Sequence, residues 1–461
     1  MSYQLDRDTM IVTFKMGSDC TDFTHNTAQK FKLFPFLTTG EAIVSLNNVL
    51  GEWLRIANSE IAVFESADEV IGKMTELVDV ENEHLASFSS IVKSLFWTPS
   101  GILKPININF MKYIPCEKNE AKIAEYLYSV LGSDDIKTTI ENATKETELQ
   151  ADVLDKALMS VLGSGERRSS PISQYFQISA VAQETFNDDL KFIVANSLRA
   201  KEHLSELLEF YYFFYTSQVC LTLDQFDQGN RTQPIPLFFS LDWEKTSKAR
   251  NCYKQGWSIL ESSINNMFYH AVTLEILNQT NSATQYDYIA ISELINQDTE
   301  FDIANQIKSA TDIYRSIMIS KMNGVQKVEY EALEKHIEQG SVFSEILYLY
   351  ESVKNQFKRD NSPSERYSRK FKMFCHEHFL KHRGQSGMML NITEERLIFL
   401  TKLAIKDNDQ MSLNDVFEQF KKRGIYFDSS SKEEIIKFYS KLNLIDKKSD
   451  SGDAQYVKRF L

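Results

Sequence analysis

Hydrophobic residues recur at helical spacing through the last seventy positions of the chain. In the first run, Leu397, Leu400 and Ala404 fall on one face of a helix, because intervals of three and four residues return to the same side. Gly424 follows the basic end of the second run, where a helix commonly ends. Each run begins at a residue type that caps helices: Thr393, Ser412, and Ser430 or Ser431. The pattern therefore predicts three short helices.

Two short extended segments follow the third helical run. They span 444–448 and 455–461, and the residues between them are rich in serine, aspartate and glycine, which favours a turn. Three helices and a β-hairpin in this order predict a winged helix. Such a module places its third helix in the major groove when it binds DNA. Winged helices also dock proteins, so both functions stay open at this point.

The region before the winged helix is predicted to be largely helical. Long periodic runs occupy three stretches: 184–226, 302–322 and 329–356. A further helix is expected to begin at a cap on Asp242. Residues 1–115 are mixed, with possible strands at 10–15 and 106–111, and their fold is left unassigned.

The fold class is therefore expected to be mainly α and multi-domain. Clusters of chain-breaking residues at 163–171 and 361–363 suggest the boundaries. We expect three parts: a mixed N-terminal domain at 1–165, a long-helix scaffold domain at 166–360, and a basic helix plus winged helix at 361–461.

The most apolar stretch, 204–223, contains Glu206 and Glu209 near one end, which favours a buried core helix over a membrane span. Its aromatic block at 210–215 is expected to pack in a core, with a partner surface as the second interpretation. No secretory leader is recognised, and the five cysteines are scattered without a CxxC pair. We therefore expect a cytoplasmic protein that does not enter a membrane.

Charge is distributed unevenly along the chain. Residues 354–461 hold 22 Lys and Arg against 15 Asp and Glu, whereas the preceding residues hold 29 against 49. A basic end on an acidic body suggests contact with a polyanion, although a charge run is also the usual composition of a solvated helix face. The candidate contacts to DNA phosphates are Arg366, Arg369, Lys370, Lys372, Lys381, Arg383, Lys437, Lys441, Lys447 and Lys448.

Motifs for catalysis are missing from the sequence. The single Gly-Lys pair, at Gly72, lacks the rest of a phosphate-binding loop, and neither a nucleophile elbow nor a His-Glu-x-x-His helix occurs. We therefore expect no enzymatic activity and no cofactor. Cys375, His378 and His382 are spaced to share one helical face and form a weak zinc candidate. The alternative is a partly buried basic helix without metal.

The same end of the chain resembles a known family. The run RGIYFD at 423–428, the segment at 442–457 and the HRG triplet at 382–384 are similar to the C-terminal end of the DptG (DndG) family. The resemblance implies a subunit of bacterial restriction machinery that attacks DNA lacking a phosphorothioate mark. It also implies two larger partners, one of them an ATPase, and supplies no catalytic residues.

Together these observations predict a non-catalytic DNA-binding and scaffold subunit of a phosphorothioation-dependent restriction complex that acts in phage defence. Its basic end would contact duplex DNA, and its acidic body would bind the larger subunits. The alternative is a protein-interaction adaptor whose winged helix docks a partner instead of DNA. A stand-alone nuclease is the weakest of the three interpretations.

Overall fold

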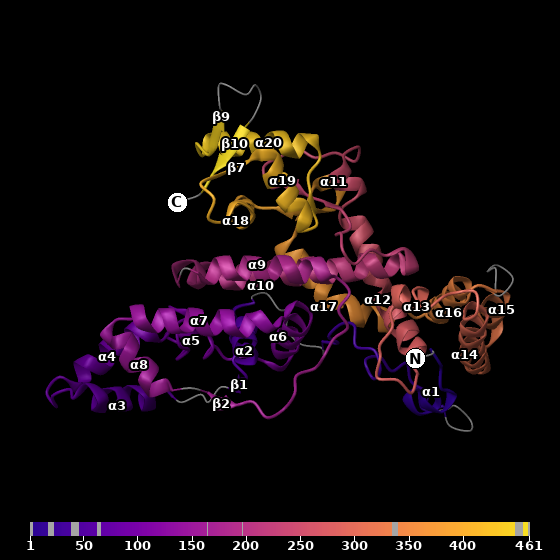
Figure 1. Ribbon diagram of the computed structural model, residues 1–461, viewed down its shortest axis with the longest axis horizontal. Helices are drawn as coiled ribbons and strands as arrows, with labels where there is room; N and C mark the ends of the chain where they lie inside the picture. The colour runs from indigo at the N-terminus through magenta and orange to yellow at the C-terminus, as the bar shows by residue number, and fades with distance from the viewer. Residues whose placement is uncertain are drawn as a thin grey trace.

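The computed structural model describes residues 3–16, 23–37, 46–61, 66–163, 165–195, 197–333, 340–447 and 455–459. The fold is mainly α with small sheets, as the sequence predicts. Figure 1 shows helices α9 and α10 crossing the middle of the molecule, a C-terminal module above them and an arm to one side below. No helix in these ranges is long and apolar enough to cross a membrane.

The N-terminal third is helical throughout its longer elements. Its helices are α1 (Arg7–Thr13), α2 (Asn47–Ala57), α3 (Ala67–Val78), α4 (Leu85–Phe96), α5 (Ile108–Met111), α6 (Lys118–Leu131), α7 (Asp134–Gln150) and α8 (Val153–Leu162). The strands predicted at 10–15 and 106–111 are wrong, because α1 and α5 occupy those positions. The side chains of Asp6 and Asn107 cap these helices by accepting hydrogen bonds from backbone N–H groups. The strands present are β1 (Glu60–Ile61) and β2 (Glu166–Arg167), which pair antiparallel.

Longer helices form the middle of the chain. They are α9 (Ala180–Val194), α10 (Ser197–Asp224), α11 (Asn251–Lys254), α12 (Trp257–Leu277), α13 (Tyr288–Ser292), α14 (Glu300–Lys321), α15 (Gly324–Ala332), α16 (Val342–Gln356) and α17 (Ser362–His378). The predicted cap on Asp242 is wrong, because that residue follows the short strand β4 (Ser240–Leu241) and α12 begins at Trp257. Glycine precedes this helix, so no capping side chain marks its start.

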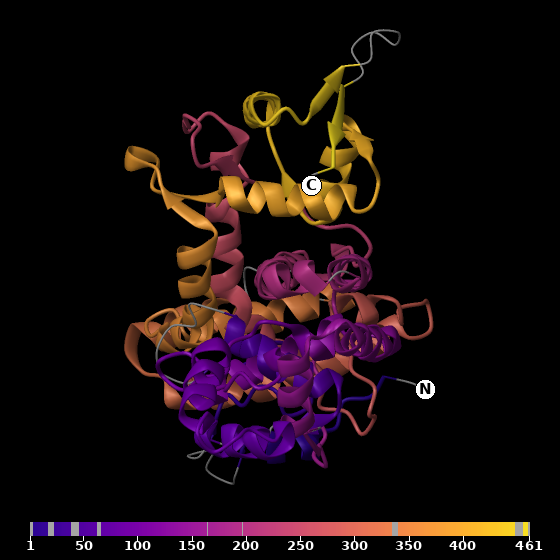
Figure 2. The same ribbon diagram turned by 90° about the vertical axis from the view of Figure 1, so that its left-hand side faces the viewer.

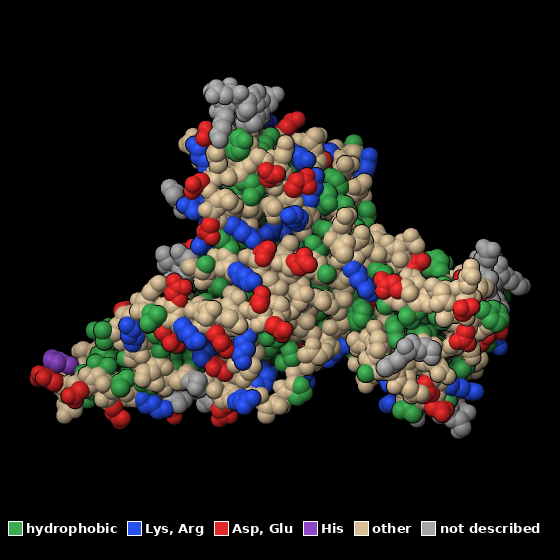
Figure 3. All heavy atoms as spheres, viewed as in Figure 1, with side chains coloured by type: hydrophobic (Ala, Val, Ile, Leu, Met, Phe, Trp, Pro, Cys, Tyr) green, Lys and Arg blue, Asp and Glu red, His purple; other side chains and the backbone are tan. Residues whose placement is uncertain are grey.

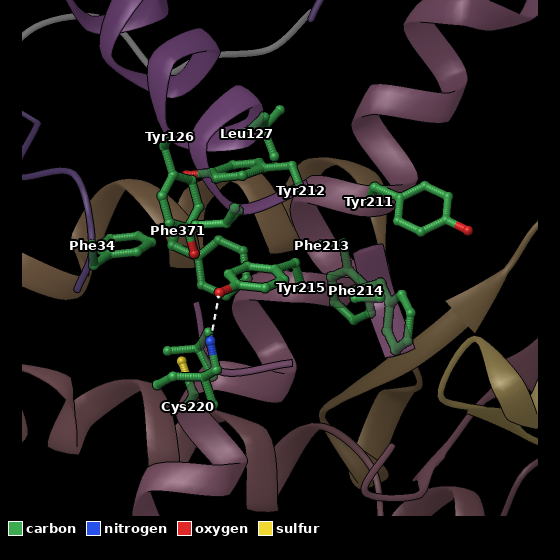
Figure 4. Close-up of a cluster of buried hydrophobic side chains, with 14 of the residues drawn as sticks. Phe34, Tyr126, Leu127, Tyr211, Tyr212, Phe213, Phe214, Tyr215, Cys220 and Phe371 are labelled. Atoms are coloured by element: carbon green, nitrogen blue, oxygen red, sulfur yellow. Dashed lines mark hydrogen bonds between the residues drawn. The ribbon is translucent and has the colours of Figure 1, made fainter. Parts of the chain in front are cut away.

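Helix α10 lies at the centre of the main core. All six aromatic side chains at 210–215 are at most 2 % exposed. Tyr212 packs edge-on against Phe374 with ring centroids 4.7 Å apart, and Phe213 stacks on Phe379 at 4.0 Å. The hydroxyl of Tyr215 accepts the backbone N–H of Ile178 at 3.0 Å (Figure 4). The aromatic block is core, and its interpretation as a partner surface is wrong.

A second, separate core lies inside the part of the molecule that we call the arm, which is built from α3, α4 and α8. Helices α3, α4 and α8 enclose it, with Met74, Val92 and Leu158 among its buried side chains. Figure 1 shows these helices extending from α2 and α7 at the edge of the molecule. Most of the other buried hydrophobic residues, from α1 to the C-terminal module, belong to one continuous core.

The C-terminal module has the predicted winged-helix order. It comprises α18 (Glu394–Ile405), β7 (Gln410–Ser412), α19 (Leu413–Lys422), β8 (Ile425–Tyr426), α20 (Ser429–Lys441), β9 (Ile445–Lys447) and β10 (Gln455–Lys458). β10 pairs antiparallel with β9 and with β7, a strand that the sequence did not predict. Thr393 and Ser412 cap their helices as predicted. The third cap is wrong, because the Asp428 carboxylate, not a serine, accepts the Ser431 N–H at 3.1 Å.

Short parallel pairings attach this module to the rest of the chain. Strand β3 (Leu237–Phe238) pairs with β8, inside the module. Strand β4 pairs with β6 (Met388–Ile392), which pairs in turn with β5 (Leu380–His382) just before α18. The loop between α10 and α12 therefore supplies strands that hold the module against the body.

Candidate nucleic-acid interface

Helix α20 holds the third position of the winged helix, where such modules contact DNA. Ile435, Phe438 and Tyr439 point inward and are buried. The outward side carries these exposed residues: Ser430, Glu433, Lys437, Ser440 and Lys441. The Nζ of Lys437 lies 2.7 Å from a carboxylate oxygen of Glu434, one turn earlier on the helix. This outward face is therefore polar and open, and it carries both signs of charge.

The wing consists of β9 and β10. Lys458 is exposed at its end, and Arg459 lies 3.9 Å from Asp409. Lys448, a predicted phosphate contact, lies outside the described residues, and the structure describes the backbone of Lys447 but not its side chain. Neither residue is placed relative to the α20 face.

The positive charge of the C-terminal end lies before the module. Residues 393–461 hold 13 Lys and Arg against 12 Asp and Glu, so the winged helix has a net charge of only +1. Residues 354–392 hold 9 against 3 and carry the remaining +6. The net positive charge therefore lies mainly on α17 and its flanks.

One side of α17 is buried and the other is basic. Tyr367, Phe371 and Phe374 face the core. Arg366 and Arg369 are exposed on the outer side, and Lys370 and Lys372 are half-buried. In Figure 2, α17 lies to the left and the wing to the upper right.

Two other predicted contacts, Lys381 and Arg383, are bound to the body. The Nζ of Lys381 donates to the Asp242 carboxylate at 2.8 Å. Arg383 reaches the Leu241 carbonyl oxygen at 2.5 Å and the Asn391 side-chain oxygen at 2.8 Å. Both cations lie where β4 meets β6, and we leave them out of the proposed DNA surface.

A buried ion pair joins the module to α9. Arg423, at the end of α19, donates to both carboxylate oxygens of Asp189, at 2.9 and 2.5 Å, and the two residues are 2 % and 0 % exposed. Tyr211 donates to the same carboxylate at 2.7 Å. Burial opposes the charged guanidinium, but the Asp189 carboxylate outweighs it and holds the pKa of Arg423 above its ordinary value. This contact was not predicted from the sequence, because no local pattern indicates that two residues 234 positions apart will pair.

A second joint fixes the start of α20. Arg250 donates to both oxygens of Asp428, at 3.0 and 2.5 Å, and to the hydroxyl of Ser431 at 2.7 Å. Burial raises the pKa of Asp428, but the hydrogen bond and charge of Arg250 outweigh it, so the net pKa lies below its ordinary value. Trp243 packs on Phe438 beside this network, with centroids 5.0 Å apart. The inner flank of α20 is therefore held by the body, which leaves its outer face available.

The residues of the weak zinc candidate do not form a site. Helix α17 ends at His378, and His382 lies in strand β5, so the expected common helical face is wrong. Cys375 is fully buried, and burial raises the pKa of its thiol. The Nδ1 of His378 lies 3.1 Å from the Glu209 carboxylate, which also binds Arg396. In the described ranges, Glu81, Glu83 and His84 do bring three possible ligand atoms within 4.8 Å of one another, but all three residues are exposed.

A cleft of about 480 Å³ lies where the module meets α9. Its charged residues are four cations and three anions: Lys406, Lys421, Lys422, Arg423, Glu184, Asp188 and Glu418. The charge of Arg423 is compensated by Asp189 beneath it. Lys421 pairs with Glu418 at 2.5 Å, and Lys406 lies 3.3 Å from Asp189. This balance gives the cleft no preference for an anion or a cation.

Comparison with known proteins gives no further assignment. No protein-family model matches the chain. No curated protein matches it either.

Proposed function

We propose that the chain is a non-catalytic scaffold subunit that contacts duplex DNA within a phosphorothioation-dependent restriction complex active in phage defence. The observation that carries the DNA part is the winged helix itself, whose α20 is held on its inner flank and open on its outer one. The scaffold part is supported by the large acidic body to which the module is fixed.

Phosphate attraction would come mainly from α17 in this proposal. Arg366 and Arg369 project from the part of the chain with the highest net positive charge, and neutralising phosphates releases counterions. Lys437 and Lys441 on α20 would add contacts nearer to the bases. In this proposal, α17 and α20 contact DNA as two distinct surfaces.

The restriction-complex part rests on the resemblance to the DptG (DndG) family. Arg423, Asp428 and Arg383, which belong to the similar segments, all hold the module on the body. The segments that resemble the family therefore include residues that fix the position of the winged helix on the body. It implies larger partners, including an ATPase, in the cytoplasm.

An adaptor function is the second candidate, and one observation favours it. The module has a net charge of +1, and Glu433 lies on the outer face of α20, one turn before Lys437. Such a face is also suited to a polar protein surface, where opposite charges give specificity.

DNA binding by the full chain tests the proposal. Intact protein is the right material, because α17 packs its buried side into the main core and a fragment beginning at 354 would lack those contacts. Fluorescence anisotropy with a labelled duplex would be recorded across a salt series for four proteins. These are the wild type, Arg366→Glu/Arg369→Glu, Lys437→Glu/Lys441→Glu, and the control Lys137→Glu/Lys327→Glu on α7 and α15.

Affinity should fall linearly with salt on a log–log plot, by about 0.9 in slope for each phosphate neutralised. The α17 variant should lose roughly two units of slope on that basis, and the α20 variant should also bind more weakly. The control carries the same charge change and should match the wild type. Absence of binding at low salt, or equal losses in all three variants, would reject specific DNA contact and favour the adaptor.

A further inference from the structure

Helix α4 of the arm has an apolar side that is partly exposed to solvent. On α4, Phe88, Ile91 and Leu95 are spaced three and four residues apart and lie along one side. Ile91 is 56 % exposed and Leu95 48 %. Ile102, in the turn that follows α4, is 41 % exposed, and its N–H donates to the Thr98 hydroxyl at 3.1 Å, which holds the turn at the end of the helix. Phe88 is half-buried and packs against the arm's core. We call these four residues the α4 stripe, and Ile91, Leu95 and Ile102 are its exposed members.

The α4 stripe lies on the flank of α4 away from its neighbour. Val92 and Phe96 point into the arm's core. Lys93 lies on the other flank, where its Nζ is 2.8 Å from Asp68 of α3. Helix α3 therefore covers one flank, the core lies beneath, and the α4 stripe occupies the flank where a further helix would pack as α3 does. Exposed apolar surface of this kind commonly marks a protein contact.

The surroundings of the α4 stripe are acidic. Residues 67–104 hold six Asp and Glu against three Lys, a net charge of −3. Lys104 lies at the far end of α4, where its Nζ donates to the Ser94 carbonyl oxygen at 2.6 Å. Glu81 and Glu83 stand immediately before α4 and are exposed. Figure 3 shows hydrophobic side chains gathered over α4 and acidic ones at the tip of the arm. A second copy of the arm would bring two acidic rims together, which opposes self-association through this surface.

We infer that the α4 stripe docks an amphipathic helix of a partner protein, with apolar residues at i, i+3, i+4 and i+7 and lysines or arginines beside them. The apolar side chains of that helix would cover Ile91 and Leu95, and its cations would meet Glu81 and Glu83. This is the helix-to-groove mode of recognition, in which apolar anchors give affinity and the charged rim selects the partner. The α4 stripe would bind this partner whether or not the chain binds DNA. The partner surface then lies on the arm and not at the buried aromatic block.

Two designed helical peptides provide the probe. They share one apolar face and differ only in flanking residues, which are lysines in one and glutamates in the other. Anisotropy would measure their binding to the full-length wild type and to Ile91→Asp/Leu95→Asp. The control is Val325→Asp/Val328→Asp on α15, where the two valines are 62 % and 65 % exposed. Melting curves would establish that all three proteins are folded, which is expected because the substituted side chains lie outside the core.

The lysine peptide should bind the wild type and the control alike, and at least about ten-fold more tightly than the glutamate peptide. Ile91→Asp/Leu95→Asp should weaken it by about ten-fold or more, since truncated anchors commonly cost that much. Equal binding to this variant, equal binding of both peptides, or no binding of either would overturn the inference. So would sedimentation showing a wild-type dimer that Ile91→Asp/Leu95→Asp dissociates, because a second copy would then occupy the α4 stripe.

Discussion

Replacing Arg423 by methionine should release the winged helix from the body. Methionine keeps most of the length of the arginine stem but removes both bonds to Asp189. The Asp189 carboxylate would then remain at 0 % exposure with Tyr211 and Lys406 as its partners. A buried charge that loses its main counter-charge must be desolvated without compensation or must be reached by water.

The magnitude follows from this burial. Removing one member of a buried ion pair costs about 3–5 kcal/mol, whereas an exposed pair contributes about 0–1 kcal/mol. The lower half of that range is expected here, because Tyr211 still donates to Asp189 at 2.7 Å. A loss of about 3 kcal/mol corresponds to a little over two orders of magnitude in an equilibrium constant.

Hydrogen exchange is the suitable assay, because it reports local opening separately from unfolding of the whole chain. Amides of α18, α19 and α20 should exchange roughly a hundred-fold faster in Arg423→Met if undocking governs their exchange. Amides of α14 and α16 should be unchanged. Arg459→Met provides the control, since Arg459 is 3.9 Å from Asp409, which is 97 % exposed.

Two results would refute the reasoning. The first is exchange in the module of Arg423→Met that equals that of the control, which would mean that the strand pairings alone hold the module. The second concerns Arg423→Met/Asp189→Leu, which removes both charges and should recover much of the lost protection. If this double variant recovers no protection from exchange, the loss of packing volume, and not the unpaired charge, causes the destabilisation.

Two further predictions concern pH and catalysis. Burial, with a smaller contribution from Lys321, lowers the pKa of His25 to about 4, and its Nε2 lies 2.8 Å from the Tyr314 hydroxyl. Between the ordinary histidine pKa of about 6.5 and that value, the unfolded state binds more protons, so stability should fall as the pH drops through this window. His25→Gln should lose less over the same window in thermal melts, and parallel profiles would exclude His25 as the cause. The purified chain should hydrolyse no ATP and cleave no DNA with added metal, because its sequence shows neither a phosphate-binding loop nor a carboxylate set with a lysine partner. Activity that co-elutes with the protein through several columns would contradict this.

The winged helix was predictable because its signals are local. Thr393 and Ser412 each lie three residues before the amide they cap, so the sequence shows both partners. Hydrophobic spacing within α18, α19 and α20 likewise needs no distant information. The error at the third cap arose because Asp428 and the three serines that follow it offer similar capping groups, and only the backbone path selects among them.

The candidate site was only partly predictable. The exposed positions of Arg366, Arg369, Lys437 and Lys441 agree with their places on helical faces. Arg383 has the same residue type and a similarly basic neighbourhood, yet it binds the Leu241 carbonyl oxygen across 142 positions of sequence. A list of basic residues cannot separate these cases, because exposure depends on which distant segment packs nearby.

The sequence by itself determined the helical class, the C-terminal module and the lack of known catalytic motifs, since each depends on spacing or residue type within a short window. Tertiary structure decided that the aromatic block is core, that Arg423 and Asp428 anchor the module, and that α4 has an open flank. The physical reason is that burial and ion pairing are set by contacts between segments far apart in the chain. The local pattern limits which faces can be buried, and long-range packing selects the ones that are.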